Sequence, residues 1–177
     1  MRTTNDVSRV AFDSGALTTI RNAVAEAYPK ESFGILYGDF VDRELMITHV
    51  QVMQKVDSTA NSVRPDIKAK KRIDSLMDLD KMHELGSYHS HPRSCYPYLS
   101  KTDAGEWGVL DEIVQVVVSA NLTRFGLRKW YKLDDNTLAT RILCDKPLAL
   151  RLRCFTRRQK TPRGYVKLPI GRRRLTA

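Results

Sequence analysis

Two histidines at alternate positions, followed by a proline, constrain the fold more than any other stretch of the chain. The run 88–92 is Tyr-His-Ser-His-Pro, and it follows apolar and small residues, as is typical of the end of a β-strand. Alternate residues of a strand point to the same face, so His89 and His91 can reach one point in space. Pro92 cannot donate a hydrogen bond to a neighbouring strand, and we expect it to end this one.

A carboxylate lies within reach of the two histidines along the chain. Asp103 follows His91 by twelve residues, and Ser100 precedes Asp103 by three. Ser100 suits the N-cap of a helix, with Asp103 in the first turn. Taken alone, this pair predicts only helix capping, in which the acid interacts with the positive end of the helix. A lone His-x-His pair is also common in proteins that bind no metal.

Together, the three side chains supply the ligand set of a catalytic zinc site. Such a site usually has three protein ligands and leaves the fourth position to water. His89, His91 and Asp103 offer two neutral nitrogens and one carboxylate. Zinc lowers the pKa of a water ligand to about 7, and a general base must then take up the proton. Glu31, at the start of the apolar run 33–37, is the candidate base, although an isolated acid beside a turn is most often a surface residue.

The order of these motifs resembles that of the JAB/MPN metalloproteases, also called JAMM proteases. Their signature is a Glu, then at a distance His-Ser/Thr-His-Pro, then a Ser and an Asp three residues later. The chain has these residues at Glu31, 89–92, Ser100 and Asp103. The run 29–38 is also similar to the P-x-E-x-x-G-x-L-x-G segment of the family. Eight residues, rather than the usual seven, separate the second histidine from the serine.

The resemblance implies an α/β fold with a JAB/MPN-like (cytidine-deaminase-like), mixed, largely antiparallel sheet flanked by helices. It implies a zinc-dependent peptidase or isopeptidase in which one Zn²⁺ ion is held by His89, His91 and Asp103. Glu31 would act as the base, and Ser100 would stabilise the oxyanion. The expected substrates are conjugates of ubiquitin or a ubiquitin-like modifier, or a small sulfur-carrier protein. Noncatalytic members lack ligands of this set, whereas this chain retains all of them.

Hydrophobic periodicity predicts an alternation of strands with a few helices. One helix begins at Asp13 or Ser14 and is closed by Pro29, and a second, short one begins at Ser100. Further helix is expected over 66–83, and a loop over 58–65. Strands are expected at 7–12, 33–37, 44–56, the histidine run, 111–120, 125–133 and 137–144.

The positive charge of the chain is confined to its C-terminal part. Residues 145–177 carry eleven Lys and Arg against one acid, which equals the net charge of +10 of all 177 residues. The resemblance covers roughly 7–144, so we expect a JAB/MPN domain over 1–144 and a basic, partly flexible extension over 145–177. This extension could bind nucleic acid or an acidic partner, and the alternative function is therefore that of a JAB-fold binding protein.

Several classes of protein are disfavoured by the sequence. No apolar run reaches the roughly 20 residues that cross a bilayer, and no signal region is evident, so we expect a cytoplasmic protein without membrane contact. The H-x-E and P-C-x-x-C motifs of zinc deaminases are absent. Three cysteines do not suggest a disulfide framework. Cys95 is expected to be an ordinary loop residue, with a disulfide to Cys144 as the alternative.

Overall fold

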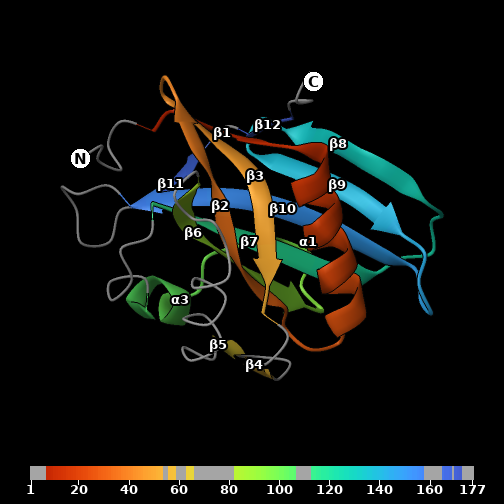
Figure 1. Cartoon of the computed structure of the whole chain (residues 1–177). Coiled ribbons are helices and arrows are strands. Elements are labelled where there is room, and N and C mark those ends of the chain that lie inside the picture. Colours follow the sequence, from red (N-terminus) through yellow and green to blue (C-terminus); the bar gives the residue numbers. More distant parts are fainter. Residues whose placement is uncertain are drawn as a thin grey trace.

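One large, curved β-sheet dominates the computed structural model of the protein (Figure 1). The structure describes residues 7–53, 56–58, 63–65, 82–106, 113–157, 165–168 and 170–172. In chain order the elements are β1 (Arg9–Phe12), α1 (Ser14–Ala27), β2 (Phe33–Val41), β3 (Glu44–Val52), β4 (Val56–Ser58), β5 (Val63–Pro65), β6 (His83–Pro92), α3 (Lys101–Glu106), β7 (Val114–Leu122), β8 (Arg128–Asp134), β9 (Thr137–Ile142), β10 (Leu148–Arg157), β11 (Tyr165–Leu168) and β12 (Ile170–Arg172).

The strand pairing is mixed but largely antiparallel. The ten-stranded sheet has the order β12-β1-β3-β2-β6-β7-β10-β9-β8, and β11 pairs with β10. Parallel pairing joins β1 to β3 and β12, and β6 to β7, whereas the other pairs of this sheet are antiparallel. The α/β class and the largely antiparallel sheet expected from the sequence are confirmed.

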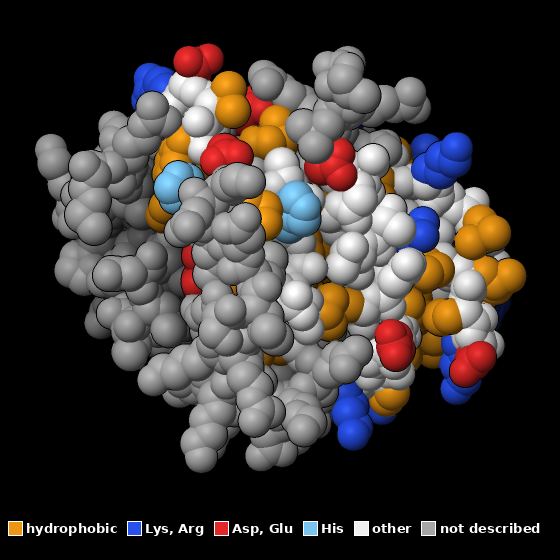
Figure 2. All heavy atoms as spheres, in the orientation of Figure 1, with side chains coloured by type: hydrophobic (Ala, Val, Ile, Leu, Met, Phe, Trp, Pro, Cys, Tyr) orange, Lys and Arg blue, Asp and Glu red, His pale blue; other side chains and the backbone are white. Residues whose placement is uncertain are grey.

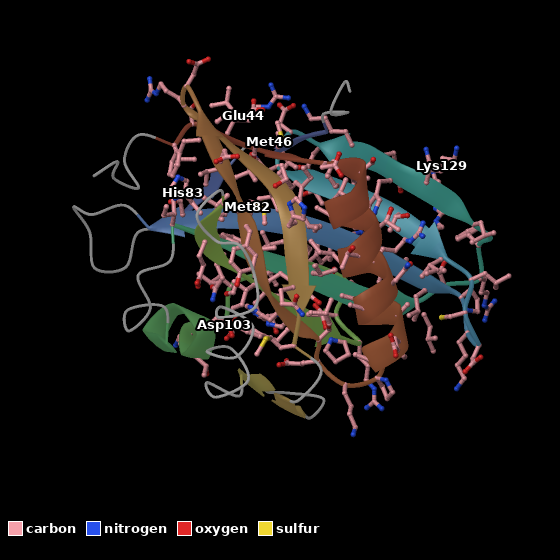
Figure 3. The ribbon with its side chains drawn as sticks, in the orientation of Figure 1. Glu44, Met46, Met82, His83, Asp103 and Lys129 are labelled. Carbon is pink, nitrogen blue, oxygen red and sulfur yellow. The ribbon has the colours of Figure 1, made fainter. Side chains whose placement is uncertain are left out.

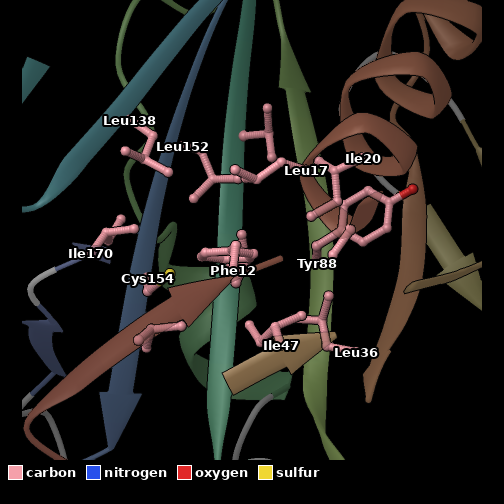
Figure 4. Packing of buried hydrophobic residues seen from close by; sticks show 14 of the residues in the cluster. Phe12, Leu17, Ile20, Leu36, Ile47, Tyr88, Leu138, Leu152, Cys154 and Ile170 are labelled. Carbon is pink, nitrogen blue, oxygen red and sulfur yellow. The ribbon is translucent and has the colours of Figure 1, made fainter. Parts of the chain in front are cut away.

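Helix α1 covers one face of the sheet, and the core lies between them. Asp13 caps the helix, because its Oδ1 accepts a hydrogen bond of 2.6 Å from the Gly15 N–H. Leu17 and Ile20 recur at helical spacing and are buried against the strands, as Figure 4 shows. Trp130 of β8 donates from Nε1 to the Leu17 carbonyl at 3.1 Å, so the far end of the sheet also contacts the helix. The first predicted helix is confirmed.

Strand β10 lies inside the sheet, between β7 and β9. Its alternate residues Leu148, Leu150 and Leu152 are buried in the core, whereas Arg151 and Arg153 point to the opposite face. The sequence divides the chain after residue 144, but β10, β11 and β12 follow this position and belong to the same sheet. Residues 148–157, 165–168 and 170–172 of the basic segment are therefore part of the sheet.

Two further expectations differ from the structure or lie outside it. The predicted loop at 58–65 contains the last residue of β4 and all of β5, and these strands pair antiparallel in a two-stranded sheet. The helix predicted over 66–83 lies almost entirely outside the described residues. Among the helices that the structure describes, none is long and apolar enough to span a membrane.

Gly86 of β6 is required by the close approach of β7. Its φ of +153° disfavours L side chains, and a Cβ at this position would collide with the Val114 carbonyl. We expect Gly86→Ala to lower the free energy of unfolding by about 3 kcal/mol, measured by urea denaturation. Gly126→Ala is the control, because nothing lies within 4 Å of a Cβ there. Equal stability of the two variants would contradict the described β6–β7 contact.

Candidate metal centre

The two histidines lie at the C-terminal end of β6, where this strand is paired on both edges. His89 is opposite Phe33 of β2 and Val117 of β7, and His91 is opposite Ser119 of β7. Both imidazoles are almost fully buried, with 5% and 9% of their surface exposed. The alternation of a strand thus holds both rings on the sheet face opposite the α1-covered core.

The carboxylate of Asp103 meets the two imidazoles at one point. The Nε2 atoms of His89 and His91 are 3.1 Å apart, and Asp103 Oδ2 lies 3.4 Å from each. Asp103 comes from α3, and Figure 3 shows it between this helix and the sheet. Residues twelve positions apart are therefore brought together by the turn of the chain after β6.

Ser100 fixes the position of this carboxylate. The Ser100 N–H donates to Asp103 Oδ2 at 2.7 Å, and the Asp103 N–H donates to Ser100 Oγ at 3.1 Å. This is the reciprocal capping box that the sequence predicts at the start of the short helix. From the sequence, Asp103 could serve in helix capping or in metal binding. In the structure, its Oδ2 atom takes part in the capping box and also faces the two imidazoles.

The surroundings keep Asp103 ionised. Burial by itself raises the pKa of this carboxyl group, but hydrogen bonds with His89, His91 and Ser100, together with the electrostatic interaction with His89, outweigh burial. The net result is a pKa well below the usual range. An ionised carboxylate is the form that binds a cation.

The arrangement fits a tetrahedral cation site. Ligands about 2.0 Å from an ion in tetrahedral geometry lie about 3.3 Å apart. The three separations of 3.1, 3.4 and 3.4 Å among His89, His91 and Asp103 are close to this value. The other ring nitrogen of His91, Nδ1, is buried without a hydrogen-bond partner among the described residues. Within this part of the chain, the His91 ring therefore makes its polar contacts through Nε2. These three residues could hold one metal ion.

The strand register places Glu31 beside this cluster. The Ser32 N–H donates to Ser90 Oγ at 2.8 Å, and the Ser90 N–H donates to the Ser32 carbonyl at 2.9 Å. Ser32 therefore lies opposite Ser90, and continuing the antiparallel register puts Glu31 opposite His91. Opposed residues project to the same face. Glu31 is buried, with 6% of its surface exposed, and it is not one of the three converging ligands.

A buried polar contact anchors the chain just before β2, next to Glu31. The hydroxyl groups of Ser32 and Tyr88 are 2.9 Å apart. Burial raises the pKa of Tyr88 to about 12, partly offset by this hydrogen bond, so the phenol stays neutral. The Tyr88 ring also fills the space next to Gly34, where a Cβ would collide with it. The chain entering β2 is thus fixed against the histidine strand.

The loop between the histidines and Ser100 is held by residues that sequence reasoning missed. Arg151 of β10 donates from Nη1 to the Cys95 carbonyl at 2.8 Å and lies over the Tyr96 ring, 4.9 Å from its centroid. Asn121 Nδ2 donates to Cys95 Sγ at 3.0 Å. Tyr98 packs its ring 5.0 Å from that of His91. The high positive charge of the C-terminal segment concealed the structural role of Arg151.

All three cysteines are free, so Cys95 and Cys144 form no disulfide. Cys95 is an exposed loop residue, as expected. The Cys144 S–H donates to the Lys146 carbonyl at 2.9 Å. Cys154 is fully buried, and burial raises the pKa of its thiol, so it remains protonated in the core. None of them belongs to the converging group of ligands.

The other two histidines lie outside the centre. His49 and His83 are exposed, whereas His89 and His91 are buried. Figure 2 shows that histidine side chains reach the surface on the face drawn there. His83 begins β6, far from Asp103, as the labels in Figure 3 show. His49 is hydrogen-bonded to its neighbour Thr48 at 2.9 Å.

The chain is similar to one family model and to solved structures. The family model described as prokaryotic homologues of the JAB domain matches residues 13–131, more than half of the chain. A solution structure of a protein from Desulfitobacterium hafniense aligns with a TM-score of 0.60 and 15% identity over 93% of both chains. A JAB1/MPN domain protein from Archaeoglobus fulgidus aligns with a TM-score of 0.45 and 19% identity, over 92% of this chain and 97% of the other. No curated protein matches.

Removal of one ligand tests the cluster as a metal site. We expect the full chain to bind one Zn²⁺ in a calorimetric titration, and His89→Ala and Asp103→Asn to weaken binding by more than about 100-fold, since loss of outer partners alone costs about 10- to 100-fold. His49→Ala is the matched control, because this histidine is exposed and remote from the cluster. Unchanged affinity in His89→Ala would place the metal elsewhere.

Proposed function

The chain belongs to the family of prokaryotic JAB-domain homologues, and we propose that it is a zinc-dependent peptidase or isopeptidase. The observation that carries the proposal is the convergence of His89, His91 and Asp103 on one point beside a buried acid, Glu31. The donor set of two imidazoles and one carboxylate suits zinc with an open position for water. When bound, zinc supplies a Lewis acid that polarises a carbonyl group and lowers the pKa of water to about 7.

Glu31 is proposed as the general base. Extension of the β2–β6 register toward His91 supports this role, and Glu31 is not one of the three grouped ligands. It can take a proton from the attacking water and later return it to the nitrogen of the leaving amine. Attack of the water oxygen on the amide carbonyl carbon forms a C–O bond and a tetrahedral intermediate. The C–N bond then breaks as the proton is returned to the nitrogen, which releases an amine and a carboxylic acid.

Ser100 is proposed as the hydrogen-bond donor to the oxyanion. Its Oγ already accepts a hydrogen bond from the Asp103 N–H, which fixes the direction of the hydroxyl group. The hydroxyl hydrogen then remains available for the oxygen that gains charge during attack. A preorganised donor of this kind stabilises the transition state more than the substrate.

For the substrate, we propose the isopeptide bond between a lysine side chain and the C-terminus of ubiquitin or a ubiquitin-like modifier. A small sulfur-carrier protein is the other candidate. Both rest on the resemblance of the motifs at Glu31 and 89–103 to those of the JAMM proteases. The free cysteines agree with a reducing, cytoplasmic location, which is part of the same proposal.

Binding of nucleic acid or an acidic partner by the basic extension stays a prediction. Arg151 and Arg153, two of its charges, are engaged within the fold through Cys95, Thr137 and Asp134. The structure does not describe most of the other basic side chains of this segment. The main proposal therefore concerns the centre at the end of β6.

Glu31→Gln separates the base from the metal site. It keeps the size of the side chain but removes its ability to accept a proton, so we expect kcat on a modifier–lysine conjugate to fall by about 100- to 10,000-fold. Zinc affinity should stay within about threefold, because Glu31 is outside the ligand set. Cleavage is followed on gels, in parallel with a sulfur-carrier fusion and a plain peptide.

Glu26→Gln is the matched control, since Glu26 is exposed on α1 and should leave kcat unchanged. Full activity of Glu31→Gln with zinc bound would contradict the assignment of the base. Failure of the zinc-loaded chain to cleave any of the three substrates would contradict the peptidase proposal itself.

A further inference from the structure

The histidine-bearing face of the sheet continues beyond the metal centre into a row of basic side chains. His91 of β6 is opposite Ser119 of β7, and Ser119 is opposite Arg151 of β10. Partners across a ladder project to the same face, so Arg151 lies on the face of the imidazoles, two strands away. The α1-covered core occupies the other face.

Two more arginines extend this row to the edge of the sheet. Arg141 of β9 is opposite Ala149, which precedes Arg151 by two residues and shares its face. Arg128 of β8 is opposite Arg141. With strands about 4.8 Å apart, the three arginines lie about 10 to 20 Å from His91 across the sheet.

Each of these guanidinium groups is stacked on an aromatic ring. Arg128 lies 3.6 Å from the centroid of Tyr131, and Arg141 lies 4.9 Å from the centroid of Phe125. Arg151 is stacked on Tyr96 in the loop next to the metal centre. Stacking orients a guanidinium group and leaves N–H donors on its edge available for a carboxylate, although Arg151 already uses Nη1 for the Cys95 carbonyl.

None of the three arginines has a carboxylate partner within the part of the chain that the structure describes. Arg153 is the contrast on the same face. Its guanidinium group donates to Thr137 Oγ1 at 2.7 Å and to Asp134 Oδ2 at 3.5 Å, so its charge is compensated inside the protein. Among the described residues, Arg153 is thus paired with an acid, whereas Arg128, Arg141 and Arg151 are not.

We propose that Arg128, Arg141 and Arg151 form a docking surface for an acidic segment of the polypeptide substrate. The proposal rests on the peptidase function, because the segment that docks is part of the substrate. The surface and the metal centre lie on the same face of the sheet, so one polypeptide can reach both. An extended peptide advances about 3.3 Å per residue, so the acidic side chains would lie about three to six residues from the bond that is cleaved.

A polypeptide fits this surface better than a nucleic acid. Single-stranded nucleic acids bind through aromatic rings with a face open to the bases, combined with phosphate contacts. Here an arginine already covers one face of each of Tyr131, Phe125 and Tyr96, which leaves at most one face of each ring for a base. The guanidinium edges remain, and they match the bidentate geometry of carboxylates.

Binding of a labelled peptide to the full, metal-free chain tests the docking surface independently of catalysis. One peptide carries a run of glutamates, and the other carries glutamines in their place. We expect the glutamate peptide to bind more tightly, and Arg128→Glu and Arg141→Glu each to raise its Kd by about fivefold, measured by fluorescence anisotropy. Arg151 is not used for this test, because it also holds the loop at Cys95.

Arg21→Glu is the matched control, since it makes the same charge change on α1, which covers the opposite face. Its Kd should stay within about twofold of that of the unmodified chain. Equal binding of the two peptides, or equal weakening by Arg21→Glu, would overturn the proposal. So would tighter binding of an oligothymidylate that depends on Arg128 and Arg141, because it would assign the surface to nucleic acid.

The outcome is separable from that of the peptidase proposal. Binding that depends on Arg128 and Arg141 supports the docking surface even if the zinc-loaded chain cleaves no conjugate. If the chain is active, glutamates placed three to six residues from the bond, the spacing derived from about 3.3 Å per residue, should raise kcat/KM about fivefold over glutamines. An active chain that ignores these glutamates would overturn the docking proposal and leave the peptidase proposal intact.

Discussion

Strand β6 is hydrogen-bonded on both edges, antiparallel to β2 and parallel to β7, and the candidate centre depends on both pairings. A parallel pair cannot be closed by a tight turn, so the chain must cross over the sheet before β7 begins. This crossover carries Ser100 and Asp103, and the capping box directs the Asp103 carboxylate back to the imidazoles. On the other edge, Phe33 is opposite His89 and Ser32 is hydrogen-bonded to Ser90, so Glu31 is the next residue of the chain toward His91. One strand thus collects all the groups of the proposed hydrolytic centre.

Local chemistry in the sequence predicts the parts of the site that lie close together along the chain. The alternation at 89–91 predicts the shared direction of the imidazoles, and Ser100 with Asp103 predicts the capped helix. The placement of Glu31 near His91 depends on the register of β2 and β6, which pairs Phe33 with His89, 56 positions further along the chain. That register is fixed by the Ser32–Ser90 and Ser32–Tyr88 contacts, which no local pattern encodes. The motif of the family, and not the hydrophobic periodicity, therefore identifies Glu31 as the candidate base.

The C-terminal segment shows why charge alone is a weak guide to structure. Its excess of arginine suggests an extension, yet Leu148, Leu150 and Leu152 alternate with those charges and fill the core. A strand with one buried and one polar face can carry a high net charge without leaving the sheet. Arg151 then has a task that the sequence could not reveal, because its contact at Cys95 joins residues 56 positions apart.

The central claim is that two imidazoles and one carboxylate hold a zinc ion with an open position at the end of β6. X-ray absorption at the zinc edge of the loaded full chain tests it directly. The account predicts about four nitrogen or oxygen neighbours at about 2.0–2.1 Å, with the multiple-scattering signature of two imidazoles. This signature should be reduced in His89→Ala. Scattering from sulfur at about 2.3 Å, or a first shell without imidazole, would contradict the account.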